Sequence, residues 1–325
     1  MNNLFKYLTI VASVVILSAC NNDWEDEQFE HYISFKAPLN QQGLTPIYVR
    51  YKPDGYVTYQ LPLIVSGSNT NEKNMTVHVA VDPDTLAKFN QERFSTRTEL
   101  FYKQLPTPQF FTIPSTVNIP SGKSDALMPI EFSLANLDLV DKWVVPLTIL
   151  DDASYNYRSN PKKHYKKALL RVYPFNNFSG EYSATGLQVF IKGSNVSLVP
   201  DYKMAYVFDE NTVFFYAGLV NEDRLDRGNY KIFVTFNDNL SLTVTTDNPD
   251  NNLVVSGSPN YIVLEEMDAV RPYLNRKYVT LNLDYEFTDY TSVPGYPIEF
   301  TVSGSLIMER QINIQIPDED QAILW

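Results

Sequence analysis

The chain has 325 residues and a formal net charge of −12, with 44% hydrophobic and 14% aromatic residues, among them 22 Tyr. This composition is too apolar for a disordered chain, and the acidic balance excludes nucleic acid as a partner that bulk charge would attract. The one Cys excludes an intramolecular disulfide and a Cys-rich zinc site.

The first twenty residues have the order of an export signal. Lys6 precedes an apolar run over residues 7–17, small residues follow, and Cys20 ends the segment. The run is shorter than the roughly 20 residues that a membrane-spanning helix needs. We therefore predict a cleaved signal peptide over residues 1–19, and we disfavour a transmembrane anchor.

The tetrad Leu17-Ser18-Ala19-Cys20 resembles the bacterial lipobox. This resemblance implies cleavage before Cys20 and acylation of Cys20, which would anchor the protein in a membrane through several acyl chains. Residues 20–31 are predicted to form an acidic tether. The acidic stretch over residues 23–27 resembles the surface-export signal of Bacteroidetes lipoproteins, which implies a position in the outer membrane facing the cell exterior. A solvated, extended tether gives the same pattern.

Most of the remaining chain has the pattern of β-strands. Residues 75–81 alternate cleanly between apolar and polar, and residues 143–149 and 168–173 are apolar runs of strand length. One short helix of about two turns is predicted over residues 82–90, where Asp82 is a suitable N-cap. Because no other segment has helical periodicity over ten residues, folds that alternate strands and helices are excluded.

A domain boundary is predicted near residues 173–180, where proline, two asparagines and a glycine separate two strands. The segments 32–174 and 175–325 on either side are each of ordinary domain size. Long strands are expected in the second segment at residues 202–208, 212–219, 230–236, 240–246, 277–287 and 298–308. The pattern predicts an all-β protein whose second domain is an antiparallel β-sandwich or an open β-barrel.

Several stretches of the first half resemble a Bacteroidetes domain of unknown function that begins secreted lipoproteins, including family 18 endo-glycosidases. They are residues 63–67, 77–90, 117–122 and 145–149. The resemblance implies an immunoglobulin-like or fibronectin-like β-sandwich. Residues 180–182 and 302–306 resemble parts of its usual all-β companion domain. Proteins with both halves are encoded among polysaccharide-utilisation genes. The resemblance therefore implies glycan binding at the cell surface without catalysis, with an outer-membrane transporter complex as a protein partner.

Catalytic chemistry has little support in the sequence. The three histidines, His31, His78 and His164, do not suggest a catalytic triad or a metal site, so no catalytic residue, metal or cofactor is predicted. A glycosidase needs only two carboxylates. Asp284 and Glu286 are the best such pair, because alternation places them on the same face of one strand. A solvent-exposed sheet face explains that pair equally well.

Aromatic residues in loops are the candidates for sugar contacts, because sugar C–H faces stack on exposed rings. The candidates are Tyr155, Tyr157, Tyr261, Arg271, Tyr273, Tyr290 and Tyr296. For any one tyrosine, a half-buried ring with a hydrated hydroxyl is the alternative. The sequence thus favours a glycan-binding surface lipoprotein. An adhesin-like or complex-forming protein that binds protein, and a glycosidase acting through Asp284 and Glu286, remain as alternatives.

Overall fold

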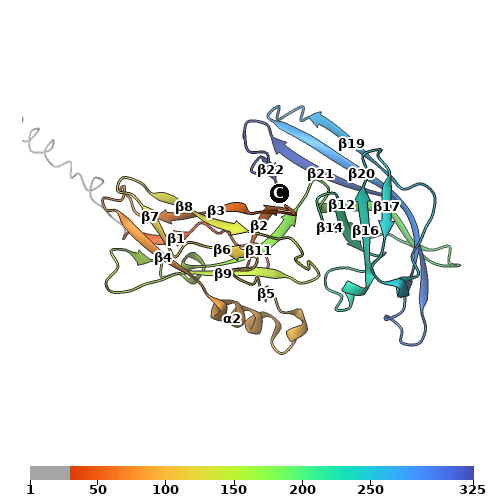
Figure 1. Ribbon diagram of the computed structural model, residues 1–325, viewed down its shortest axis with the longest axis horizontal. Helices are drawn as coiled ribbons and strands as arrows, with labels where there is room; N and C mark the ends of the chain where they lie inside the picture. Colours follow the sequence, from red (N-terminus) through yellow and green to blue (C-terminus); the bar gives the residue numbers. More distant parts are fainter. Residues whose placement is uncertain (1–29) are drawn as a thin grey trace, which may run out of the picture.

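The computed structural model describes residues 30–325 and confirms the all-β prediction (Figure 1). The predicted signal peptide, Cys20 and the tether up to residue 29 lie outside the described residues. Two β domains lie side by side, with the N-terminal domain on the left of Figure 1 and the C-terminal domain on the right. No helix within residues 30–325 combines the length and the apolar character that a membrane span requires.

The N-terminal domain is a sandwich of two sheets. The first has the strand order β10-β1-β3-β8-β6 and the second β2-β11-β9-β4-β7, with β5 beside β9. The first sheet comprises β1 (Tyr32–Phe35), β3 (Val57–Val65), β6 (Phe111–Thr112), β8 (Asp125–Phe132) and β10 (Arg158–Ser159). The second comprises β2 (Thr45–Arg50), β4 (Met75–Val81), β5 (Lys103–Gln104), β7 (Thr116–Ile119), β9 (Trp143–Ile149) and β11 (Lys167–Phe175).

The core of this sandwich follows from alternation along its strands. Inward residues of both sheets, such as Leu61 and Ile130 from one and Val77 and Val145 from the other, are fully buried in one cluster. Most pairs are antiparallel, but β2 runs parallel to β11. In that parallel register Tyr48 lies opposite Tyr173, so both rings project from the outer face of the sheet.

The predicted helix is present and longer than expected. Helix α2 (Pro83–Phe94) has 12 residues instead of about two turns. The Asp82 carboxylate accepts a hydrogen bond from the backbone N–H of Thr85 and pairs with Lys167 at 2.6 Å. Leu86 packs the helix against Val144 on the outer face of the second sheet. The other short helical segments are η1 (Thr98–Leu100), α3 (Lys163–Lys166), η2 (Arg227–Tyr230) and η3 (Pro249–Asn251).

The connection between the domains is short and tightly bonded. Strand β11 ends at Phe175 and β12 begins at Gly180. The Asn176 side chain accepts hydrogen bonds from the backbone N–H groups of Phe178 and Ser179, and Arg310 donates to the carbonyls of Asn176 and Ser179. These bonds fix the chain where it passes from one domain to the other.

The C-terminal domain is one antiparallel sheet of eleven strands. Its main order is β17-β16-β15-β14-β12-β21-β20-β18, with β13, β19 and β22 attached to β12, β20 and β21. A bridge between Ser241 and Asn260 brings the two sides of the sheet together at one point, which gives a half-barrel. Its strands are β12 (Gly180–Ile191), β13 (Ser197–Leu198), β14 (Tyr202–Val207), β15 (Thr212–Tyr216), β16 (Lys231–Phe236), β17 (Leu242–Thr245), β18 (Val254–Val255), β19 (Asn260–Met267), β20 (Leu274–Asp289), β21 (Ile298–Asn313) and β22 (Ile323–Leu324).

Candidate functional site

Tyr155 and Tyr157 line a polar hollow of about 570 Å³ between loops of the N-terminal domain. Tyr155 stacks on His78, with 4.1 Å between the ring centres. Tyr157 is only 6% exposed. Its hydroxyl donates to the Leu150 carbonyl at 2.7 Å and accepts from the His78 backbone N–H at 2.9 Å. Tyr157 therefore holds the loop in place, and its ring is not available for stacking on a ligand.

Tyr261 and Tyr290 also have structural contacts. Tyr261 is 8% exposed and packs against Phe178 and Phe236, so its ring belongs to the core of the C-terminal domain. Tyr290 packs against Tyr230, and its hydroxyl accepts a hydrogen bond from the side chain of Asn248. Tyr261 lies in strand β19 and not in a connection as the sequence predicted, and Tyr290 is partly buried against the same core, so packing explains both tyrosines without a ligand.

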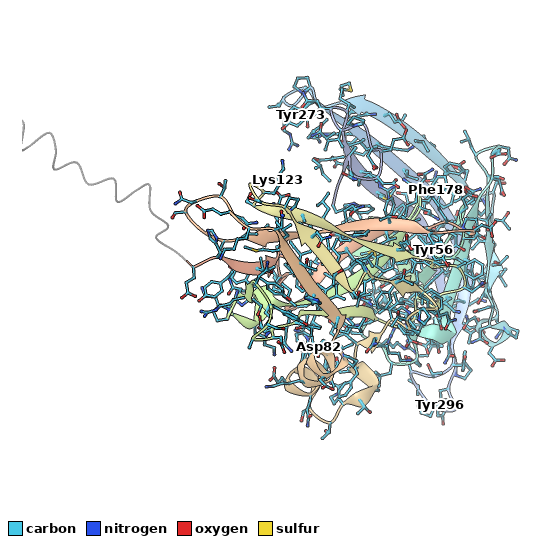
Figure 2. The ribbon with its side chains drawn as sticks, turned by 60° about the vertical axis from the view of Figure 1, so that its left-hand side comes forward. Tyr56, Asp82, Lys123, Phe178, Tyr273 and Tyr296 are labelled. Carbon is cyan, nitrogen blue, oxygen red and sulfur yellow. The ribbon has the colours of Figure 1, made fainter. Side chains whose placement is uncertain are left out.

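The remaining predicted contacts lie at opposite ends of the long strand β20. Arg271 and Tyr273 precede β20, and Arg271 forms an ion pair with Asp268 at 3.4 Å. Tyr296 follows β20 in the turn to β21 and is 73% exposed. Figure 2 shows Tyr273 and Tyr296 far apart. The predicted set therefore does not converge on one surface.

A different set of aromatic residues gathers in a cleft between the two domains. Two adjoining chambers, of about 360 and 440 Å³, share the lining residues Arg171, Tyr173, Glu181, Met204 and Tyr206. We call them the small and the large chamber. The outer face of β2 and β11 forms one wall of the small chamber, and β12, β14, β21 and β22 of the C-terminal domain form the other.

The small chamber contains an aromatic stack. The rings of Tyr48 and Trp325 lie parallel, with an interplanar angle of 2° and 4.0 Å between their centres. The ring of Tyr173 lies beside that of Tyr48, with 5.6 Å between their centres, because the two residues are partners in the parallel register of β2 and β11. Trp325 is 48% exposed, so part of its indole ring is open to solvent at the cleft.

A network around Glu222 holds the two domains together in the large chamber. The Glu222 carboxylate pairs with Lys142 at 3.2 Å and Arg171 at 3.5 Å, both from the N-terminal domain, and accepts a hydrogen bond from the Tyr206 hydroxyl. Burial on its own would raise the pKa of Glu222, but the two cations outweigh it and hold the pKa below its usual value. Glu222 is therefore ionised at neutral pH.

Two further groups line the large chamber. Lys203 is 7% exposed, and its ammonium group donates to the carbonyls of Gly218 at 2.9 Å and Val220 at 2.7 Å. Burial lowers the pKa of Lys203 to about 7. Tyr216 is 3% exposed, and its hydroxyl interacts with the side chain of Arg227.

The carboxylate pair considered for glycosidase chemistry lies away from this cleft. Asp284 is exposed on β20 and accepts a hydrogen bond from Ser303 at 2.5 Å. Glu286 pairs with Lys192 at 3.0 Å. Neither lines the small or the large chamber. Within residues 30–325 there is also no group of three or more His, Cys, Asp or Glu side chains placed to hold a metal ion.

Comparison with known proteins assigns relatives to both domains. Residues 24–153 match the family model of a domain of unknown function, DUF4973, and residues 166–307 match a second model described as a C-terminal domain. A Bacteroides ovatus protein of unknown function is 46% identical, covering 90% of this chain and 100% of its own, with a TM-score of 0.81.

Two other solved structures resemble this chain to a similar degree. A multidomain B. ovatus protein that includes DUF1735 is 45% identical over 90% of this chain and 100% of its own, with a TM-score of 0.81. A Bacteroides thetaiotaomicron protein described as an auxiliary nutrient binding protein is 40% identical over 91% of this chain and 100% of its own, with a TM-score of 0.82. No match was found among curated proteins.

Proposed function

Because the chain belongs to the family of two-domain Bacteroides proteins that these solved structures represent, we propose that it is a nutrient-binding protein that holds a glycan in its interdomain cleft without transforming it. The observation that carries this proposal is the cleft itself, with the Tyr48–Trp325 stack in one chamber and charged groups in the next. The likeness to the nutrient-binding relative supports the same class of function.

The chemistry of the cleft suits a sugar. Aromatic rings offer flat apolar surfaces to the C–H faces of pyranose rings, and Tyr and Trp keep a polar group for hydrogen bonding. Glu181 and Arg171 line both chambers and supply acceptors and donors for hydroxyl groups. Each chamber has the volume of a small-molecule site, and together they suit an oligosaccharide.

The binding proposal is tested by affinity electrophoresis and calorimetry of the full mature chain against neutral and acidic polysaccharides. We expect retardation by a subset of these polysaccharides, and saturable binding of their oligosaccharides. Failure to bind any member of a broad panel would overturn the proposal. Hydrolysis of a bound oligosaccharide would overturn its non-catalytic part.

We also propose that Cys20 is acylated and that the protein faces outward from the outer membrane, where it delivers glycan to a transporter complex. Cys20→Ala is expected to move the protein out of the membrane fraction of cells that express it, because the acyl chains would be lost. Replacing the four acidic residues within 23–27 with serine is the matched second variant. It should leave membrane association intact and abolish labelling of the protein on whole cells. Unchanged fractionation of Cys20→Ala would contradict the anchor.

A further inference from the structure

Each chamber of the cleft has its own solvent-exposed aromatic ring. Trp325 lines only the small chamber and is 48% exposed, and Figure 1 places it between the two domains. Tyr202 lines only the large chamber and is 59% exposed. Both rings lie outside the part that the two chambers share. The cleft therefore meets solvent at two separate places, and a flat apolar ring is available at each of them.

The part between these two rings is deeper and has continuous walls. Arg171 and Tyr206 line both chambers and are 5% and 7% exposed. In β14, Tyr202, Met204 and Tyr206 project from the same face, which passes from the exposed ring to the buried middle over about 13 Å of strand. Because Met204 and Tyr206 line both chambers, this face continues from one chamber into the other. Tyr173 does the same on the wall of the N-terminal domain.

Ion pairs hold the two walls apart at a fixed distance. Glu222 of the C-terminal domain pairs with Lys142 of the N-terminal domain at 3.2 Å in the large chamber. Near the small chamber, Arg50 at the end of β2 pairs with Asp320, which precedes β22. A cleft that is fixed in this way does not close around its ligand, so it suits a ligand that is longer than the cleft itself.

We infer that the cleft binds an internal segment of a polysaccharide chain, which runs from Trp325 through the shared middle to Tyr202 and continues into solvent at both places. This inference rests on the proposed glycan-binding function and names the part of the glycan that is recognised. A site for a chain end has to enclose the last sugar ring. Here an exposed aromatic ring lies at each opening, where the next sugar of a continuing chain can stack on it.

The length of the polysaccharide separates internal binding from recognition of an end. The probes are short and long size fractions of the linear polysaccharides in the panel, among them pullulan, β-mannan, polygalacturonate and hyaluronan. Calorimetry with the full mature chain gives the number of protein molecules that bind each polysaccharide chain. We expect that number to rise in proportion to chain length, because each protein occupies one segment. Recognition of an end would fix the number at one for each end, whatever the length.

Two variants test the path of the chain. Tyr202→Ala should weaken binding of the long fraction by at least about threefold, and Trp325→Ala should have a similar effect at the other opening. The Tyr202 ring is exposed, so its loss should leave the fold intact, which thermal unfolding checks. Tyr296→Ala is the matched control, because it removes an exposed tyrosine ring that lines neither chamber and should leave binding unchanged.

The outcomes separate this inference from the proposed function. A number of bound proteins that stays the same in short and long fractions would overturn internal binding and leave glycan binding in place. Unchanged affinity of Tyr202→Ala for the long fraction would overturn the path through the large chamber. Binding of no polysaccharide in the panel would overturn the proposed function.

Discussion

Lys203→Met is expected to stabilise the protein at about pH 6 and to stabilise it much less at about pH 9. Burial lowers the pKa of Lys203 to about 7 in the folded protein, whereas a lysine in the unfolded chain has a pKa of about 10.4. Below the folded pKa both states carry the proton, and the folded state bears the full cost of a buried charge. Between the two pKa values the unfolded state binds more protons, so the stability of the parent rises with pH.

The size of this effect follows from the same pKa values. The difference in unfolding free energy between Lys203→Met and the parent should narrow by about 3 kcal/mol from pH 6 to pH 9. The carbonyls of Gly218 and Val220 lose a donor in the variant, which costs roughly 1 kcal/mol each but does not depend on pH. The slope against pH, and not the value at one pH, is therefore the diagnostic quantity.

Urea unfolding of both proteins across this pH range measures the slope, with Lys123→Met as the control for the loss of one exposed lysine. The control should follow the pH profile of the parent, because Lys123 is exposed. Parallel profiles for Lys203→Met and the parent would show that the ammonium group keeps its ordinary pKa in the folded state. A confirmed slope would mean that the folded chain retains a buried charge that lowers its stability.

Local patterns in the sequence predict much of this fold. The alternation over residues 75–81 and the cap at Asp82 identify β4 and the start of α2, because both signals depend only on near neighbours along the chain. The length of α2 could not be predicted in the same way. Its later turns are stabilised by packing on the outer face of a sheet, which involves Leu44, Tyr102 and Leu169 from distant segments.

The cleft was missed because the sequence does not show which strand faces meet another domain. Tyr48 and Tyr173 lie in strands, and β-propensity explains a strand tyrosine without a ligand. Only the docking of the C-terminal domain turns their outer face into a wall of the cleft. Conversely, Tyr157 and Tyr261 are predicted from the sequence to lie in loops, but both rings are buried, and Tyr261 lies in strand β19.

One signal for the buried cations was present in the sequence. In β14, Lys203 alternates in phase with Ala205 and Val207, and all three are buried. In β21, Arg310 is in phase with Leu306 and Met308, which are also buried. A cation at an inward position of an alternating strand is uncommon, because Lys and Arg are rarely buried unless they are paired. The partner itself is not predictable from one strand.

Tyr48→Ala is expected to weaken glycan binding by at least about tenfold, measured by calorimetry with the tightest-binding oligosaccharide of the panel. The substitution removes the ring that stacks on Trp325 at 4.0 Å, so the half-exposed indole ring loses the support that holds it in the small chamber. Tyr48→Phe keeps the ring and should retain most of the affinity. A similar loss in Tyr48→Phe would assign the effect to the hydroxyl and not to stacking.

Tyr296→Ala is the control variant. It tests whether the glycan binds in the cleft or at the loop tyrosines that the sequence analysis proposed as sugar contacts. Tyr296 is 73% exposed in the turn between β20 and β21 and lines neither chamber, so its removal should leave affinity unchanged. The opposite result, with affinity lost in Tyr296→Ala and kept in Tyr48→Ala, would move the glycan site from the cleft to the β20–β21 turn. Because each variant removes one tyrosine ring, a difference between them reflects the place of the ring and not the chemistry of the substitution.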